Sequence, residues 1–77
     1  MFLINSMNKI SSRKLLNSKW SKVSPSNREK HFLVTQVNFD EFSNVKYCLI
    51  EAVMTKKEEE IDWNELKDSN KWQQGWK

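Results

Sequence analysis

The sequence predicts a mainly β protein: a small, curled antiparallel sheet of three or four strands, with an SH3-like barrel as one form it could take and short helical turns at the C-terminus. Two runs rich in β-branched and aromatic residues, 30–39 and 45–54, are separated by a polar loop of hairpin length. Four tryptophans, four phenylalanines and one tyrosine in 77 residues supply large side chains for a thin core. The length fits one domain that buries roughly 60% of its unfolded surface.

The first 18 residues differ in composition from the rest. They are rich in Asn, Ser and Lys, and their apolar residues fit a helical period only weakly. We therefore expect residues 1–18 to form a basic, mobile N-terminal arm, within which Met7 is an alternative start to Met1. Residues 19–77 form the single β domain in this interpretation.

The domain begins with three predicted strands. Alternating polar and apolar residues over 19–23 predict a short first strand, and the polar stretch 24–27, which includes Pro25, predicts the turn after it. Residues 30–39 and 45–54 pair as a hairpin across the loop 40–44. In both runs, apolar residues occupy odd as well as even positions. Each strand is therefore expected to contact protein on both faces for part of its length.

The C-terminal third predicts one more strand and two helical turns. After a turn at 55–57, residues 58–63 show a period-two pattern, in which Glu59, Ile61 and Trp63 alternate with Glu58, Glu60 and Asp62, as a fourth strand would. Asp62 stands three residues before Glu65, the spacing of a capping box, which predicts a helical turn from Trp63. Trp72 and Trp76 would share one face of a second helical turn, ended by Gly75 in the left-handed conformation.

Seven short motifs stand out between residues 14 and 77: Lys14-Leu15-Leu16, Ser18-Lys19-Trp20, His31-Phe32 with Val34-Thr35, Ile50-Glu51-Ala52-Val53, Ile61-Asp62-Trp63, Leu66-Lys67-Asp68 and Trp72-Gln73-Gln74-Gly75-Trp76. Together they resemble a family of small tryptophan-rich hypothetical proteins from photosynthetic bacteria and some aquatic proteobacteria. The similarity covers residues 14–77 and depends most on the spacing of the last three tryptophans around Leu66 and Gly75. That family has no established activity, so the resemblance implies a lineage and transfers no catalytic residue.

Charge is distributed unevenly along the chain. Residues 1–28 carry six cations and no acid, whereas residues 29–77 carry seven lysines against ten acids, so a net +6 precedes a net −3. A basic segment with an aromatic residue in it is typical of nucleic-acid binding, although the segment could equally fold over its own acidic domain. The nucleic-acid candidates are Arg13, Lys14, Lys19, Lys22 and Arg28.

The tryptophans are the candidates for binding a protein partner. Trp20, Trp72 and Trp76 are the partner-binding candidates, although Trp20 and Trp63 also fit a core position. Trp76, next to the last residue, is the one most expected to be exposed. Glu58 and Glu60 with Asp62 form a solvated stripe along the predicted fourth strand rather than a metal site.

Catalysis is not predicted. One cysteine and one histidine cannot complete a four-ligand zinc site, and a single glycine excludes a Gly-rich phosphate loop. We expect no cofactor and no bound metal, no membrane span, and a cytoplasmic location. Three functions remain open: a non-enzymatic module that docks on a larger protein complex, a small protein that binds RNA or single-stranded nucleic acid, or a structural homodimer subunit.

Overall fold

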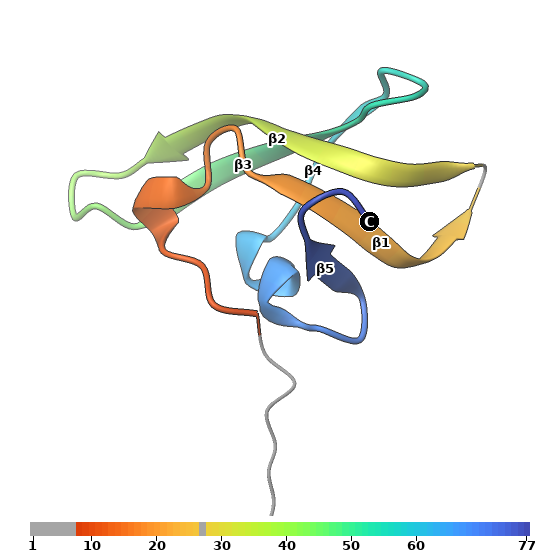
Figure 1. Ribbon diagram of the computed structural model, residues 1–77. Helices are drawn as coiled ribbons and strands as arrows, with labels where there is room; N and C mark the ends of the chain where they lie inside the picture. The colour runs from red at the N-terminus through yellow and green to blue at the C-terminus, as the bar shows by residue number, and fades with distance from the viewer. Residues whose placement is uncertain (1–7, 27) are drawn as a thin grey trace, which may run out of the picture.

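The computed structural model describes residues 8–26 and 28–77 and contains one open, five-stranded antiparallel sheet. The strand order is β4-β3-β2-β1-β5, so β4 and β5 are the edges (Figure 1). The mainly β class is confirmed, with one strand more than the three or four expected. The elements are η1 (Ser12–Lys14), β1 (Lys19–Ser26), β2 (Glu29–Phe39), β3 (Val45–Ala52), β4 (Glu58–Glu60), η2 (Trp63–Lys67) and β5 (Trp72–Gln74).

The predicted hairpin is the centre of the sheet. β2 and β3 pair from Phe32 opposite Ala52 to Phe39 opposite Val45. The loop between them is closed by Asp40, whose carboxylate accepts hydrogen bonds from the backbone N–H groups of Phe42 (2.8 Å) and Asn44 (3.0 Å). The turn chemistry therefore fixes the register of the longest strands.

The fifth strand comes from a segment expected to be helical. Trp72–Gln74 is a strand that pairs with β1, with Trp20 opposite Gln74 and Lys22 opposite Trp72. The helical prediction was wrong because residues 72–74 pair with β1 instead. This pairing gives the outer edge of β1 hydrogen-bonded partners and directs Trp72 into the core. Gly75 does adopt a left-handed φ of 82°, but it ends a strand rather than a helix.

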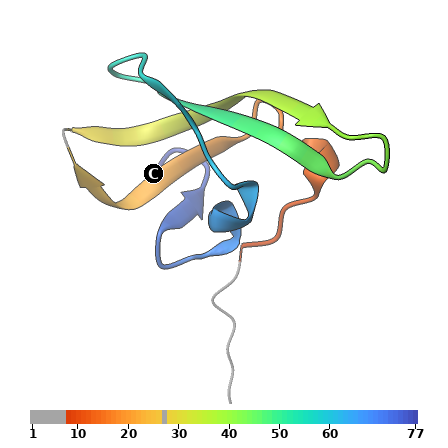
Figure 2. The same cartoon turned by 180° about the vertical axis from the view of Figure 1, so that it is seen from behind.

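The segment before β1, η2 and β5 lie on the concave side of the sheet (Figures 1 and 2), and the core lies between them and the sheet. Alternate residues of β2 and β3 point into it, while Leu33, Tyr47 and Leu49 on the opposite face are half-buried. Both faces of the hairpin thus make contacts, as the sequence predicted. The buried apolar residues are Leu15, Trp20, Phe32, Val34, Cys48, Ile50, Ala52, Leu66 and Trp72.

Residues 8–18 belong to the domain and do not form the mobile arm expected there. Leu15 is fully buried in the core, and the backbone N–H of Asn17 donates to the carbonyl of Val34 (2.9 Å). The Asn8 side chain donates to the carbonyls of Leu66 (2.8 Å) and Trp72 (2.7 Å). An apolar anchor and satisfied backbone groups hold the segment in place. The part of the predicted arm before residue 8, including Met1 and Met7, lies outside the described residues.

The turn η2 fills the space beneath the sheet between the two edge strands (Figure 2). Asp62 caps it as predicted, but its side chain accepts from the N–H of Asn64 (3.0 Å), and Glu65 contributes its backbone N–H to the Asp62 carbonyl (2.9 Å). Leu66 is the buried residue of this turn. The first strand also runs further than expected, because the predicted turn at 24–27 remains strand to Ser26.

Candidate functional site

Two of the three tryptophans predicted to bind a partner lie in the core. Trp20 is 0% exposed and Trp72 is 4% exposed, so neither can stack on a partner, and those two predictions were wrong. The indole N–H of Trp20 donates to the Ser18 hydroxyl (2.8 Å), and the Trp72 ring meets Phe32 edge-on at 5.1 Å. In a thin core these rings contribute most through buried apolar area.

Trp76 is exposed as predicted, at 43%. Its indole N–H donates to the Phe32 carbonyl (2.9 Å), and the Lys19 ammonium lies 4.8 Å from its ring centroid. The His31 ring lies 6.0 Å from the Trp76 ring and hydrogen-bonds the Lys77 carbonyl (3.0 Å). The hydrogen bond from the Trp76 N–H to β2 and the Lys19 ammonium beside the Trp76 ring help to hold the C-terminal segment against the sheet.

The five predicted nucleic-acid residues do not converge on one surface. Lys19 lies over Trp76, while Lys22 lies near the Phe32 and Trp72 rings in a hollow that Glu59, Glu60 and Glu65 also line. Arg13 lines a separate hollow with Phe39 and Ser43, Lys14 lies in a third groove, and Arg28 is exposed at the β1–β2 turn. A backbone-tracking groove needs contiguous cations, which this arrangement lacks.

One hollow lies beside a sheet edge, at the point where β3 continues past the end of β4. The ladder between these strands covers only Leu49–Glu51 of β3, and its last contact is the N–H of Ile61 donating to the Cys48 carbonyl (2.9 Å). Beyond it the chain turns away into η2, so among the described residues no strand lies beside 45–47 of β3 on this side. An unpaired strand edge is a template for another extended chain.

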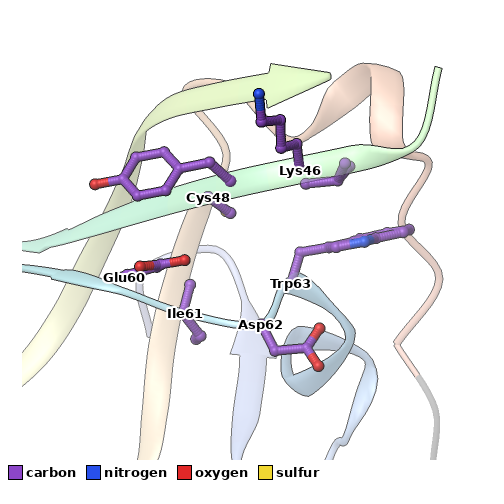
Figure 3. Close-up of a pocket in the computed structure, with 8 residues that line it drawn as sticks. Lys46, Cys48, Glu60, Ile61, Asp62 and Trp63 are labelled. Carbon is purple, nitrogen blue, oxygen red and sulfur yellow. The ribbon is translucent and has the colours of Figure 1, made fainter. Parts of the chain in front are cut away.

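Eight residues line the resulting groove, whose volume is about 490 Å³. Figure 3 shows Glu60 and Trp63 toward its two ends with Ile61 between them, while the Lys46 ammonium points away. Trp63 is half-buried and packs against the core, and the Lys67 ammonium lies 4.3 Å from its ring centroid. The lining residues are Val45, Lys46, Tyr47, Cys48, Glu60, Ile61, Asp62 and Trp63.

The charge at the groove is mostly acidic. Glu60 and Asp62 are both exposed at its rim, and Glu58 and Glu59 continue the same acidic strand. A local bulge accompanies the open edge, since Asn38 pairs with Tyr47 and Phe39 with Val45, which leaves Lys46 as an extra residue in β3. Bulges of this kind mark places where strand pairing ends and side chains are redirected.

The groove lacks a recognisable catalytic arrangement. Burial raises the pKa of the Cys48 thiol, which disfavours the thiolate that a nucleophile needs. His31 lies with Trp76 and Lys77, away from Cys48, whose partner on β2 is Val37. Within residues 8–26 and 28–77, no group of three His, Cys, Asp or Glu side chains is placed to hold a metal ion.

Sequence reasoning missed Trp63 and Glu60 as site residues. A usable signal was present, because the predicted partner of β3 was four residues shorter than the run at 45–54, and a short edge strand leaves its neighbour uncovered. Over the described part of the chain, the structure has no helix long and apolar enough to cross a membrane.

A family model described as tryptophan-rich protein (DUF2389) matches residues 18–77. Neither the curated proteins nor the solved structures give a significant match. The matched region covers all five strands, η2 and the four tryptophans, and leaves out the docked segment 8–17. Since the match spans well over half of the sequence, the chain belongs to the tryptophan-rich protein (DUF2389) family.

Proposed function

We propose that this protein is a non-enzymatic, cytoplasmic docking module that binds an extended segment of a larger protein complex at the open edge of β3. One observation carries the proposal: β3 continues past the end of β4 beside a groove of about 490 Å³. Backbone hydrogen bonds to an added strand would supply affinity, and pockets for its alternate side chains would supply specificity.

The groove also favours a particular kind of segment. Trp63 and Ile61 offer apolar surface, while Glu60 and Asp62 place two carboxylates at the rim. The complementary ligand is an extended peptide that presents an apolar side chain next to a lysine or arginine. A second copy of this chain fits less well, because an edge-to-edge pair would bring the acidic strands Glu58–Glu60 of two copies close together.

The other two functions have weaker support. Single-strand binding combines a basic groove with exposed aromatic rings, but Trp20 and Trp72 are buried and the five candidate cations are dispersed. Homodimerisation would need a large apolar patch, whereas the exposed large apolar side chains of the described residues are spread along the chain: Leu16, Val23, Phe39, Phe42, Met54 and Trp76.

Selection from a phage-displayed peptide library against the immobilised protein tests the proposal. We expect the enriched peptides to share a basic residue beside an apolar one, and to bind Glu60→Lys at least several-fold more weakly than the native protein. Glu58→Lys is the matched control, because Glu58 is exposed on the same strand but does not line the groove. Failure to enrich any peptide would count against the proposal.

A pair of tryptophan variants separates this groove from the alternative site at the C-terminus. Trp63→Leu should reduce binding of the selected peptides, and Trp76→Leu should leave it unchanged while both proteins stay folded by circular dichroism. The reverse pattern would move the docking site to the convex face, where Trp76 lies beside His31 and Lys19.

A further inference from the structure

A second groove in the structure has the opposite charge. Lys9, Lys14 and Lys67 line an open hollow of about 1010 Å³ together with Ile10 and Gln74, and no acidic side chain of the described residues lines it. These lysines come from the segment before η1, from η1 itself and from the end of η2. The fold therefore builds a cationic surface from parts that are far apart in sequence.

The lysines are positioned by the docking of residues 8–18. The backbone N–H of Asn8 donates to the Lys67 carbonyl (2.8 Å), and the Gln74 side chain donates to the Lys9 carbonyl (2.6 Å). Leu15, the residue after Lys14, is fully buried, and the Lys67 ammonium is held 4.3 Å above the Trp63 ring. Fixed backbones around three like charges make a preorganised site for an anion.

We propose that this lysine groove (Lys9, Lys14 and Lys67) binds an acidic, partly apolar segment of a partner protein. Three lysines line this groove and no carboxylate of the described residues does, which favours a ligand with several negative charges. Ile10 and the lysine methylene chains give the groove apolar surface, which suits leucine or a similar side chain set among the acids.

A peptide suits this surface better than a nucleic acid. The residues that line the lysine groove include no aromatic ring on which a base could stack, and the Lys67 ammonium lies over the ring of Trp63. The other basic residues that could extend a phosphate track, Arg13 and Lys22, line different hollows. The groove is thus a short cationic patch with apolar walls.

Fluorescence anisotropy with a labelled peptide of glutamates and interspersed leucines tests the proposal on the full chain. We expect binding at low salt, and none by the matching peptide with glutamine in place of glutamate. Raising the ionic strength from about 0.01 M to 0.15 M shortens the screening length from roughly 30 Å to 8 Å and should weaken the complex markedly.

Single substitutions locate the site. Lys9→Gln, Lys14→Gln and Lys67→Gln should each weaken peptide binding roughly 2- to 5-fold, the range for a partly exposed ion pair. Lys30→Gln is the matched control, since Lys30 is exposed on β2 and does not line the groove. Glu60→Gln should also leave this binding unchanged, so failure here and failure of the β3 proposal can be told apart.

Three results would overturn the inference. The first is acidic-peptide binding that none of the three lysine substitutions weakens. The second is an oligothymidylate that binds more tightly than the peptide with the same dependence on the three lysines, which would assign the groove to nucleic acid. The third is concentration-dependent self-association, seen by light scattering and abolished by Lys14→Gln, which would assign it to a second copy of the chain.

Discussion

Two adjacent leucines give a sharp test of whether residues 8–18 are part of the fold. Leu15 is 0% exposed and belongs to the core, whereas Leu16 is 52% exposed. Substituting a buried leucine with alanine costs about 2–5 kcal/mol of unfolding free energy, from the lost transfer of apolar atoms and the cavity left behind. A substitution at an exposed position usually changes stability by less than about 0.5 kcal/mol.

The losses of unfolding free energy expected for Leu15→Ala and Leu16→Ala distinguish a docked segment from a mobile one. If residues 8–18 were a mobile arm, Leu15→Ala and Leu16→Ala would both have small effects. Since Leu15 packs in the same core as Trp20 and Leu66, we expect Leu15→Ala alone to lose at least about 2 kcal/mol. For a domain of this size that loss lowers the melting temperature by roughly 8–16 °C.

Urea unfolding followed by tryptophan fluorescence measures both variants. The urea midpoint should fall for Leu15→Ala, with a slope close to that of the native protein, and stay unchanged for Leu16→Ala. If Leu15→Ala does not fold at all, Leu15→Met keeps the volume and should cost less than about 1.5 kcal/mol. Equal, small effects of both alanine variants would refute the docked segment and, with it, the positions of Lys9 and Lys14 in the lysine groove.

Further predictions concern single residues elsewhere in the domain. Since Cys48 is buried and its thiol pKa is raised, a thiol reagent should label it only as fast as the domain opens, and rapid labelling without denaturant would contradict its position. Gly75→Ala should lower the free energy of unfolding in urea by about 1–2 kcal/mol. Because φ is 82° and the space around an added Cβ is open, backbone strain is the source of this loss. An unchanged stability would mean that the turn can relax. Backbone N–H donation from Asn44, with a smaller contribution from that of Phe42, lowers the pKa of Asp40 below its ordinary value of 3.8. The contribution of Asp40 to stability is therefore complete above pH 3.8 and is lost as the pH falls through its lower pKa in the folded state. Asp40→Asn should flatten this part of the pH dependence of stability, and an unaltered pH dependence would count against the loop geometry.

The sequence predicted the strands whose stability is local. The hairpin of β2 and β3 was recognisable because its residue types favour a pleated surface and its loop has a defined turn length. The cap at Asp62 was also visible, since it depends on residues close in sequence. These elements required no information about distant parts of the chain.

The errors involve segments whose structure depends on distant partners. Trp72–Gln74 is a strand only because β1 lies beside it, and spacing alone equally favoured a helical turn. Residues 8–18 looked like an arm because their composition is polar, yet the buried Leu15, the half-buried Ile10 and a few hydrogen bonds suffice to dock them. A short anchor of this kind has no periodic signal.

The candidate sites were harder still to predict. The groove beside β3 depends on where β4 stops, and the lysine groove joins residues 9, 14 and 67. Of the three tryptophans proposed to contact a partner, only Trp76 is exposed, because a thin core uses most of its aromatic residues for burial. Residue type alone could not separate these two uses of tryptophan.

The most direct test of the proposed docking site is amide hydrogen exchange of the protein with and without a peptide selected from the library. In the free protein, residues 45–47 of β3, which have a paired strand only on the β2 side, should exchange faster than residues 49–51, which pair with both β2 and β4. On binding, we expect added protection at 45–47 and around Trp63, as an added strand would give. Protection confined to the region of His31 and Trp76, with 45–47 unchanged, would contradict the proposal.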